Sequence, residues 1–413
     1  MERQASINHK INLMEFDKSF SIIKYLYKNP LFGFALVIIF TAILVSILGA
    51  NIRPDGTLHS NTQIPQISRL KPGTTISFLK VRKNKEVQES NFFDKLFFGG
   101  QESFFTFVPY DKCELKDNYV LLQEYDMNRY EANYVPNKLT FSLEDIVFNL
   151  NDQARTNHEG INDLVLSSHL VEKTFFLGTD KHGRDLLSRL MAGTIISLSI
   201  GLISVLISFF LGLTLGAISG YYGGRIDDII LWFINVVWSI PALLLIISLT
   251  LILGKGYATV FIAVGLTMWV ELARVVRGQV IAIREMDYVI AGKILGFSNM
   301  RIIFKHIIPN LLDPVIVICA SNFATAILIE AGLSFLGIGV QIPMPSWGSI
   351  IDQHKEYIIH AEKSFLAIIP GLLIISLVFS FMILGHHLRS VLGRKASAET
   401  WKEQLKGAPA DSI

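Results

Sequence analysis

Six long apolar segments constrain the fold of this chain more than any other feature. A helix needs about 20 mostly apolar residues to cross the hydrocarbon core of a membrane. Six segments approach or exceed that length, at about residues 31–50, 193–219, 229–253, 258–272, 314–338 and 365–384. Charged residues make up only 17% of the chain, compared with about 25% in a typical soluble domain. The sequence therefore predicts an all-α membrane protein with six transmembrane helices.

Two of these segments contain residues that are unusual inside a membrane. Pro241 interrupts the third segment. We expect it to kink that helix, because proline lacks an amide hydrogen and its ring clashes with the preceding turn. The fourth segment is the shortest, and Glu271 and Arg274 lie at its end. We expect these two charged residues to mark the membrane edge.

Basic residues predict the orientation of the helices, because cytoplasmic loops carry an excess of Lys and Arg. The N-terminal arm (1–30) has five, the segment between the fourth and fifth spans has six, and the end of the chain has five. With six spans, all three regions fall on one side, so we expect both termini in the cytoplasm. Residues 31–52 then form the first span, and residues 391–413 form a cytoplasmic tail.

The interval between the first two spans is long and polar. Residues 53–176 contain two strand-like stretches, "TTISFLKV" and "NYVLLQEY", among turn-forming residues such as Pro72 and Gly73. Short β-branched and aromatic runs bounded by such residues are typical of strands. We therefore expect a mixed, β-rich extracytoplasmic insertion after the first helix. It is either a purely structural insertion or a docking surface for an extracytoplasmic partner.

Several kinds of chemistry lack the residues that they need. The chain has no G-x-x-x-x-G-K-[ST] phosphate loop, no nucleophile elbow and no H-E-x-x-H pair. Cys113 and Cys319 lie in different environments, so we expect two unpaired thiols. The histidines, including the adjacent His386 and His387, form no metal-binding set in the sequence, and the net charge of +2 does not indicate nucleic acid. We expect no catalytic site, no bound cofactor, no metal and no nucleic-acid partner.

A polar segment, "AGKILGFSNMRIIFKHIIPN" (291–310), separates the fourth and fifth spans. Asp287 is a plausible N-cap for a helix over 288–295, and Gly296 suits the left-handed position that ends it. Ser298 can cap a second helix, which we expect to finish before Pro309. Spacing alone leaves two interpretations open. The pair of helices either lies on lipid headgroups or binds a cytoplasmic partner.

Polar residues inside the fifth span are candidates for a transport pathway. A carboxylate in an apolar run is costly and is a functional hypothesis by default, which applies to Glu330. Asn322, eight residues earlier, is a second candidate for the pathway or its gate. Glu330 has two alternative positions: near the outer end of the span, or paired with a residue of a partner subunit.

Three motifs of this sequence resemble those of one known family. The pattern Ala291, Gly292, Gly296, Ile308-Pro309 is similar to the "EAA" loop of ABC-importer permeases, with Ile290 where that loop has Glu. The segment 177–201 is similar to the start of the transport domain in the dipeptide/oligopeptide/nickel branch, and "EAGLSFLGIGVQIPMPSWGSII" (330–351) to a second hallmark of that branch. The matching residues of the first hallmark include Gly178, Thr179, Asp180, Gly183, Arg184, Asp185, Ser188 and Arg189.

The resemblance implies a fold, a function and a set of partners. The fold would be that of a type I ABC importer permease, with a transport domain over 177–390 and cytoplasmic coupling helices over 288–308. The chain would be a C-type subunit in a bacterial inner membrane, forming half of the path by alternating access. Its partners would be a homologous second permease, two ATPases that bind ATP and Mg, an extracytoplasmic binding protein and lipid. The residues that would meet the ATPase are Tyr288, Ala291, Gly292, Leu295, Gly296, Phe297 and Ser298.

Other interpretations remain open at this point. The charged residues Asp180, Arg184, Asp185 and Arg189 either form surface ion pairs that fix the start of the second span or act in gating or partner docking. The whole protein is alternatively a secondary transporter, or a sensor or scaffold that uses the insertion as a receptor. The residues do not identify the transported solute, for which a peptide and a nickel chelate are both candidates.

Overall fold

The computed structural model describes most of the chain. The described residues are 29–85, 87, 91, 94–95, 100–116, 118–127, 135–148, 161–254, 256–341 and 343–407, without the side chains of 161–162 and 391–407. Most of the predicted N-terminal arm (1–30) therefore lies outside them. The predicted tail begins inside a helix that runs unbroken to Gly407.

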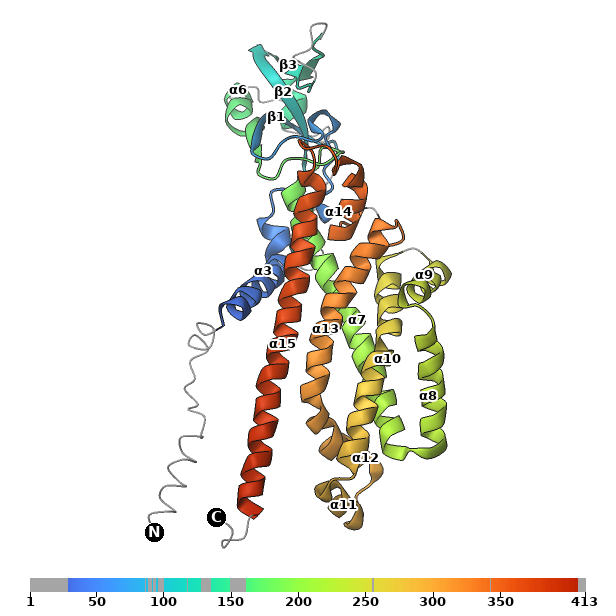
Figure 1. The fold of residues 1–413 in the computed structure, drawn as a ribbon. Coiled ribbons are helices and arrows are strands. Elements are labelled where there is room, and N and C mark those ends of the chain that lie inside the picture. The colour runs from blue at the N-terminus through green and yellow to red at the C-terminus, as the bar shows by residue number, and fades with distance from the viewer. Residues whose placement is uncertain are drawn as a thin grey trace, which may run out of the picture.

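A bundle of long helices forms the larger part of the described chain (Figure 1). Within the described residues, five helices are long and apolar enough to cross a membrane, and a bent pair of helices supplies a sixth crossing if it is counted as one span. The prediction of a helical membrane bundle is confirmed, and the predicted number of six spans is reached when the bent pair is counted as one span. The helices of the bundle are α3 (Pro30–Ile52), α7 (Leu186–Tyr222), α8 (Gly224–Ser239), α9 (Ala242–Leu253), α10 (Tyr257–Arg284), α13 (Ile308–Phe335) and α15 (Phe365–Gly407).

The third predicted span is broken more sharply than a kink. Helices α8 and α9 meet at an angle of 92°. Ile240 is extended, with φ −89° and ψ 129°, as expected for a residue that precedes proline. The ring of Pro241 would also clash with the carbonyl four residues earlier in a continuous helix. The sequence predicted the position of the break correctly but underestimated its size.

The helix that contains the fourth predicted span, 258–272, is longer than that span. Helix α10 continues to Arg284, because its basic side chains find partners on α8. Arg277 donates two hydrogen bonds of 2.6 Å to the carboxylate of Asp227, and Arg274 donates to Asn235 at 2.8 Å. Glu271, predicted to mark the membrane edge, therefore lies near the middle of this helix and not at its end.

Helices α7 and α10 pack along a line of glycines. Gly212, Gly216 and Gly220 recur every four residues on one face of α7. A Cβ atom on any of them would come within 2.6–2.9 Å of the backbone or side chains of α10. Small residues at this spacing allow two membrane helices to approach closely. This pair forms the rigid centre of the bundle.

The insertion folds into an antiparallel sheet at one end of the bundle (Figure 1). The spatial order is β4-β3-β2-β1-β5, and every neighbouring pair is antiparallel. The prediction of a β-rich insertion is confirmed. The strands are β1 (Thr74–Arg82), β2 (Phe105–Lys116), β3 (Tyr119–Glu124), β4 (Lys138–Ser142) and β5 (Leu170–Phe175).

Both faces of the sheet contribute to small cores. Leu79 and Leu122 pack against one set of short elements, and Phe78 packs with Ile67 and Phe175 in a second cluster. Phe78 and Leu79 are adjacent on β1 and are both buried, because successive side chains of a strand point to opposite faces and both faces of this sheet are covered. The short elements are η1 (Leu58–Ser60), η2 (Pro65–Ile67), α5 (Leu143–Val147), α6 (Ile161–Leu164) and η3 (Val165–His169).

The two ends of the bundle carry different elements. Helix α14 (Trp347–His354) and η5 (Lys355–Tyr357) connect α13 to α15 and lie near the sheet. Helices α11 (Asp287–Ile294) and α12 (Asn299–Ile302) lie at the opposite end, where Figure 1 shows them below α10. The insertion and the polar loop between the fourth and fifth spans are thus separated by the length of the bundle.

Candidate functional site

The polar loop forms two short helices joined by a tight turn. Gly296 has φ +74°, and its amide donates to the carbonyl of Lys293 at 3.0 Å, while the amide of Phe297 donates to Gly292 at 3.0 Å. This pair of bonds is the Schellman arrangement that ends a helix with a left-handed glycine. The predicted left-handed conformation of Gly296 at the end of the first helix is confirmed.

Other details of the loop differ from the prediction. Met286, not Asp287, is the N-cap of α11, and it makes no side-chain capping bond. Ser298 does cap α12, because its hydroxyl accepts from the amide of Arg301. The second helix does not end before Pro309. It passes through a wide π-turn, η4 (Ile303–Ile307), directly into α13. The wider turn removes the clash that the proline ring would cause in a regular helix.

The inner face of the loop is fixed to the bundle. Val289, Ile302, Ile303 and Ile307 are buried in one cluster with residues of α7 and α10. The hydroxyl of Tyr221, from the end of α7, donates to Asn299 at 2.8 Å. A displacement of α11 and α12 would therefore be transmitted to α7, α10 and α13, since the side chains in this cluster are close-packed.

The ring of Phe297 explains why glycine occupies position 292. The ring stacks on His306 with centroids 5.8 Å apart, and the guanidinium of Arg301 lies 4.2 Å from its centroid. A Cβ on Gly292 would lie 3.3 Å from Phe297, closer than an ordinary contact. The departure from the Ala of the "EAA" pattern is therefore linked to the aromatic side chain at 297.

The outer face of the loop exposes apolar side chains. Ile294 and Leu295 are 81% and 71% exposed. Tyr288 and Ala291, which are also exposed, share a face of α11 with Leu295 by their spacing of three and four residues. We call these four residues the coupling patch. Of the other residues predicted to meet an ATPase, Gly296 and Ser298 are exposed, whereas Gly292 is buried and Phe297 is half-buried.

The second predicted group of residues, the motif before α7, is not at the surface. Asp180, Arg184, Asp185 and Arg189 are all buried, so the prediction of surface ion pairs is wrong. Asp180 accepts from the amides of His182 and Arg184 and from Arg184 Nε at 2.6 Å, and Arg189 Nε lies 3.5 Å from it. These charged residues are close together in the sequence, but they are buried because the insertion covers them.

Electrostatics favours the ionised form of Asp180. Burial alone raises the pKa of this carboxyl, but the guanidinium groups of Arg189 and Arg184 and two backbone amides hold the pKa below its usual range. The sign follows from linkage: this stabilisation is present above the ordinary pKa of an aspartate and is lost as the pH falls through the lowered value.

The motif also joins the insertion to the bundle. The hydroxyl of Thr179 donates to the carbonyl of Ile67 and accepts from the amide of Leu70. Gly178 has φ +74°, and a Cβ there would lie 2.1 Å from the carbonyl oxygen of Leu70. Gly183 makes the same kind of approach to Ile64. A larger residue at either glycine would displace the first segment of the insertion.

The end of the motif begins α7. Asp185 is the N-cap of the helix and accepts from the amide of Ser188 at 2.8 Å. Ser188 in turn accepts from the amide of Asp55. Arg184 extends to two further elements, donating to Asn61 of the insertion and to Gln353 of α14, both at 3.0 Å. The motif therefore holds together the start of α7, the first part of the insertion and α14.

The two predicted pathway residues are both buried within the chain. Glu330 accepts from the hydroxyl of Ser334 at 2.7 Å, close below the N-terminus of α14, where Ser346 forms a capping box. Asn322, which precedes Glu330 on α13, is also buried. Glu330 thus lies near the end of α13 that is close to α14, and Asn322 lies deeper in the same helix. Their roles in a pathway stay predictions.

Sequence reasoning missed the polar side chains that are exposed on the long helices. Ser321 and Thr325 lie on the open side of α13, next to the buried Asn322. A hydropathy average over a long window is insensitive to single polar residues. The helical period, however, places Ser321 and Asn322 on different faces of the helix.

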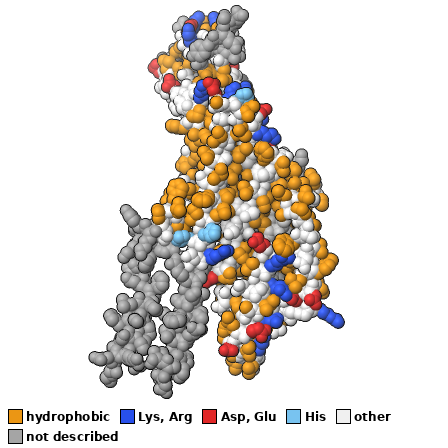
Figure 2. Space-filling model, in the orientation of Figure 1, with side chains coloured by type: hydrophobic (Ala, Val, Ile, Leu, Met, Phe, Trp, Pro, Cys, Tyr) orange, Lys and Arg blue, Asp and Glu red, His pale blue; other side chains and the backbone are white. Residues whose placement is uncertain are grey.

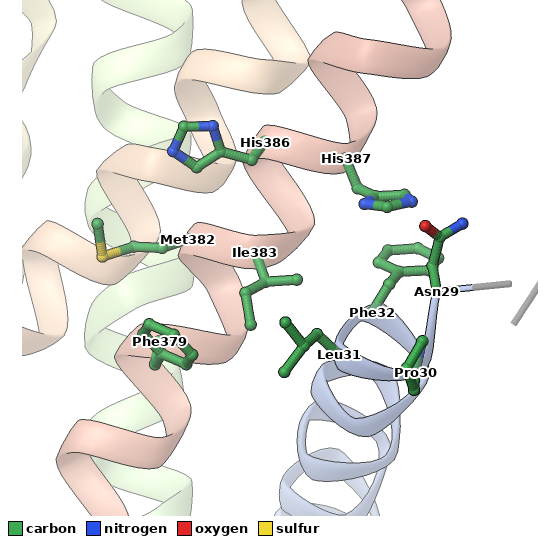
Figure 3. A pocket seen from close by; sticks show the side chains of 9 residues that line it. All are labelled: Asn29, Pro30, Leu31, Phe32, Phe379, Met382, Ile383, His386 and His387. Atoms are coloured by element: carbon green, nitrogen blue, oxygen red, sulfur yellow. The ribbon is translucent and has the colours of Figure 1, made fainter.

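A further hollow lies outside these sites. A groove of about 490 Å³ lies between α3 and α15, with Leu31, Phe379 and Ile383 on its apolar part and His386 and His387 beside it (Figure 3). His387 stacks on Phe32 with centroids 4.2 Å apart.

In the part of the chain that the structure describes, no three His, Cys, Asp or Glu residues are placed to hold a metal ion, and both cysteines are free thiols.

Comparison with known proteins identifies the family. The family profile described as "Binding-protein-dependent transport system inner membrane component" matches residues 212–392. The oligopeptide transport system permease protein of Bacillus subtilis is 36% identical over 223 residues, which are 54% of this chain and 72% of that protein. The dipeptide transport system permease protein of Haemophilus influenzae is 40% identical over 221 residues, 54% of this chain and 74% of that protein.

Two further similarities were found. The glutathione transport system permease protein of Pectobacterium atrosepticum is 37% identical over 220 residues, 53% of this chain and 72% of that protein. Among solved structures, an inward-facing methionine ABC transporter has 20% identity and a TM-score of 0.41, covering 50% of this chain and 96% of that one.

The chain belongs to the family of binding-protein-dependent inner-membrane transport components, the permeases of ABC importers. Within that family it is a permease of the peptide branch. The β-sheet lies outside the residues that the family profile matches.

Proposed function

We propose that this chain is the non-catalytic permease of an ATP-driven importer of di- or oligopeptides. Its relatives are named as permeases for oligopeptides, dipeptides and glutathione, which supports a peptide as the cargo. A homologous second permease would complete the path, and a binding protein would deliver the cargo. Two separate ATPases would bind ATP and Mg, so this chain would hold neither.

The coupling patch is the observation that carries this proposal. A ligand shifts a conformational equilibrium only through a difference in its affinity for the two states. ATP binds to another subunit, so the permease needs a rigid contact that passes the shift into its helices. The patch offers exposed apolar side chains on the outside, while Ile302, Ile303 and Ile307 fix the same loop to the bundle on the inside.

The proposed orientation places the patch in the cytoplasm. Lys293, Arg301 and Lys305 belong to the same loop and are exposed, and basic loops favour the cytoplasmic side. The sheet then faces the extracytoplasmic side, where a binding protein would dock. Both termini would be cytoplasmic, and the membrane would be a bacterial inner membrane.

An aspartate in the coupling patch tests the proposal. We expect the Leu295→Asp variant to retain little ATPase on purification and to lose most ATP-dependent peptide uptake. The reason is that a charged side chain replaces the apolar side chain of Leu295, which is 71% exposed in this chain. The matched control is Ile359→Asp, which changes a residue that is 86% exposed at the opposite end. The measurement is the amount of ATPase retained with tagged permease in mild detergent.

The outcomes separate the alternatives. Loss of ATPase in Leu295→Asp with full retention in Ile359→Asp supports the coupling role. Equal retention in both variants contradicts it and favours the interpretation of α11 as a helix that lies on lipid headgroups.

A further inference from the structure

Glu271 is a carboxylate near the middle of a membrane-spanning helix. Helix α10 has 28 residues, from Tyr257 to Arg284. Every stretch of about 20 residues within it, the length that crosses the hydrocarbon layer, contains Glu271. Its side chain is exposed on the surface of this chain. The membrane layer therefore has to include it, whichever part of α10 spans.

The basic residues nearest in sequence are occupied elsewhere. Arg274 donates to Asn235 at 2.8 Å, and its guanidinium lies 3.4 Å from the centroid of the Trp238 ring. Arg277 forms its ion pair with Asp227. Both therefore point their charges towards α8. Across the described residues, no ion pair or hydrogen bond to the carboxylate of Glu271 is present.

The face that carries Glu271 is unlike one that meets lipid. Thr267, Glu271, Gly278 and Ala282 follow a spacing of four, seven and four residues, which places them on one side of α10. Glu271, Gly278 and Ala282 are exposed, and Thr267 is half-buried. Charged side chains that face hydrocarbon are costly and rare, whereas those that line a water-filled path are common. Figure 2 shows acidic and basic side chains interrupting the hydrophobic surface partway along the bundle.

We propose that Glu271 binds the ammonium group of the cargo as it passes through the path. This inference rests on the proposed function, because peptides, unlike neutral solutes, carry a free α-ammonium group. An ammonium group that enters the path meets the one acidic side chain on this face of α10. Glu271 would act as a transient contact, while selection of the cargo would lie with the binding protein.

The rival occupant is a basic residue of the second permease. An ion pair across the subunit interface would also satisfy a carboxylate inside the membrane. The two occupants differ in what is lost when the charge is removed. A subunit contact affects assembly, whereas a cargo contact affects uptake by an assembled complex.

The test uses the complete importer in lipid vesicles, with binding protein, ATP and trialanine as the probe. Variants are Glu271→Gln, Glu271→Asp and Glu271→Lys, and the control is Glu356→Gln, an exposed carboxylate near the sheet. We expect uptake per ATP hydrolysed to fall about fivefold in Glu271→Gln, the range of one exposed ion pair. Glu271→Lys should fall further through repulsion, and Glu271→Asp should retain most of the uptake.

Each outcome decides a separate point. Unchanged uptake in Glu271→Gln overturns the inference, and so does loss of the second permease from the purified complex, which would assign the carboxylate to the subunit interface. Reduced uptake with normal assembly and normal ATP hydrolysis supports it, as does unchanged uptake of N-acetyl-trialanine where the wild-type importer moves that peptide. If wild-type vesicles take up no trialanine with ATP, the proposed peptide function itself fails.

Discussion

At the scale of single residues, burial decides what a polar side chain can do. His354 ends α14 and is fully buried beside the motif that precedes α7. Its Nδ1 lies 2.7 Å from the carbonyl of Ile350, and its Nε2 accepts from the amide of Lys181 at 3.4 Å. A neutral ring with its proton on Nδ1 satisfies both bonds. Burial is the main cause that lowers the pKa of His354 to about 4.

This residue predicts a loss of stability in mild acid. The unfolded chain takes up a proton near pH 6.5 and the folded chain only near pH 4, so the unfolded state binds more protons in between. The free energy of unfolding then falls with falling pH across that window, by up to about 3 kcal/mol. We expect the thermal unfolding midpoint of the detergent-purified complex to drop between pH 6.5 and 4.

Two variants isolate the effect. His354→Gln keeps a donor and an acceptor without the titrating proton, so its midpoint should change less over this window. His360→Gln replaces an exposed histidine nearby and should keep the wild-type slope. A wild-type slope in His354→Gln would assign the acid sensitivity to other groups.

The sequence predicted residues whose roles depend on local backbone and missed those whose roles depend on distant packing. Gly296 and Ser298 follow from rules for helix ends, which involve only four or five neighbouring residues. The burial of Asp180 was not predictable, because the covering segment lies more than 100 positions earlier. Glu271 was assigned to a membrane edge, since partners on α8 that extend α10 were not visible in the sequence.

At the scale of elements, the loop of α11 and α12 acts as one rigid piece. Its turn depends on the positive φ of Gly296, and its second helix continues through η4 into α13 without a break. A change in the turn alters the angle between α11 and the bundle. Apolar runs predicted the long helices, while their ends were set by side-chain partners that the sequence did not show.

We predict that Gly296→Val reduces ATP-dependent uptake strongly. No atom lies within 4 Å of a Cβ at this position, so the strain is in the backbone, at about 1–2 kcal/mol or more for a β-branched residue. Gly254→Val is the matched control. Gly254 also has a positive φ, of +91°, and open space around it, but it ends α9 away from the coupling patch.

The measurement is peptide uptake and ATPase activity in vesicles, with the yield of folded complex as a reference. Loss of uptake in Gly296→Val at normal yield, with Gly254→Val active, supports the role of the turn. Equal loss in both variants would indicate general destabilisation instead.

At the scale of the whole molecule, the two ends of the bundle have distinct surfaces. One end carries the sheet together with α14, and Lys71 of the insertion forms an ion pair of 3.3 Å with Glu362 of the connection between α14 and α15. The other end carries the coupling patch. The count of spans and the basic loops predicted this separation, whereas the order of the strands and their packing on the bundle required long-range contacts.

The proposed orientation predicts opposite accessibility of these ends. In a chain with Cys113 and Cys319 replaced by serine, we expect Ile359→Cys to react with a membrane-impermeant maleimide on intact spheroplasts. Ile294→Cys, similarly exposed in the chain, should react only after the membrane is permeabilised and the ATPases are removed. The reverse pattern would invert the topology and place the coupling patch outside.

The sheet also bears on how such a chain can change over evolution. Its first and last strands, β1 and β5, are direct neighbours, with Thr74 opposite Phe175, so the insertion returns the backbone to the place from which it departed. New residues can be added to, or deleted from, the far strands without altering the distance between α3 and α7. The sheet is consequently free to diverge at a rate of its own, while the bundle keeps its geometry.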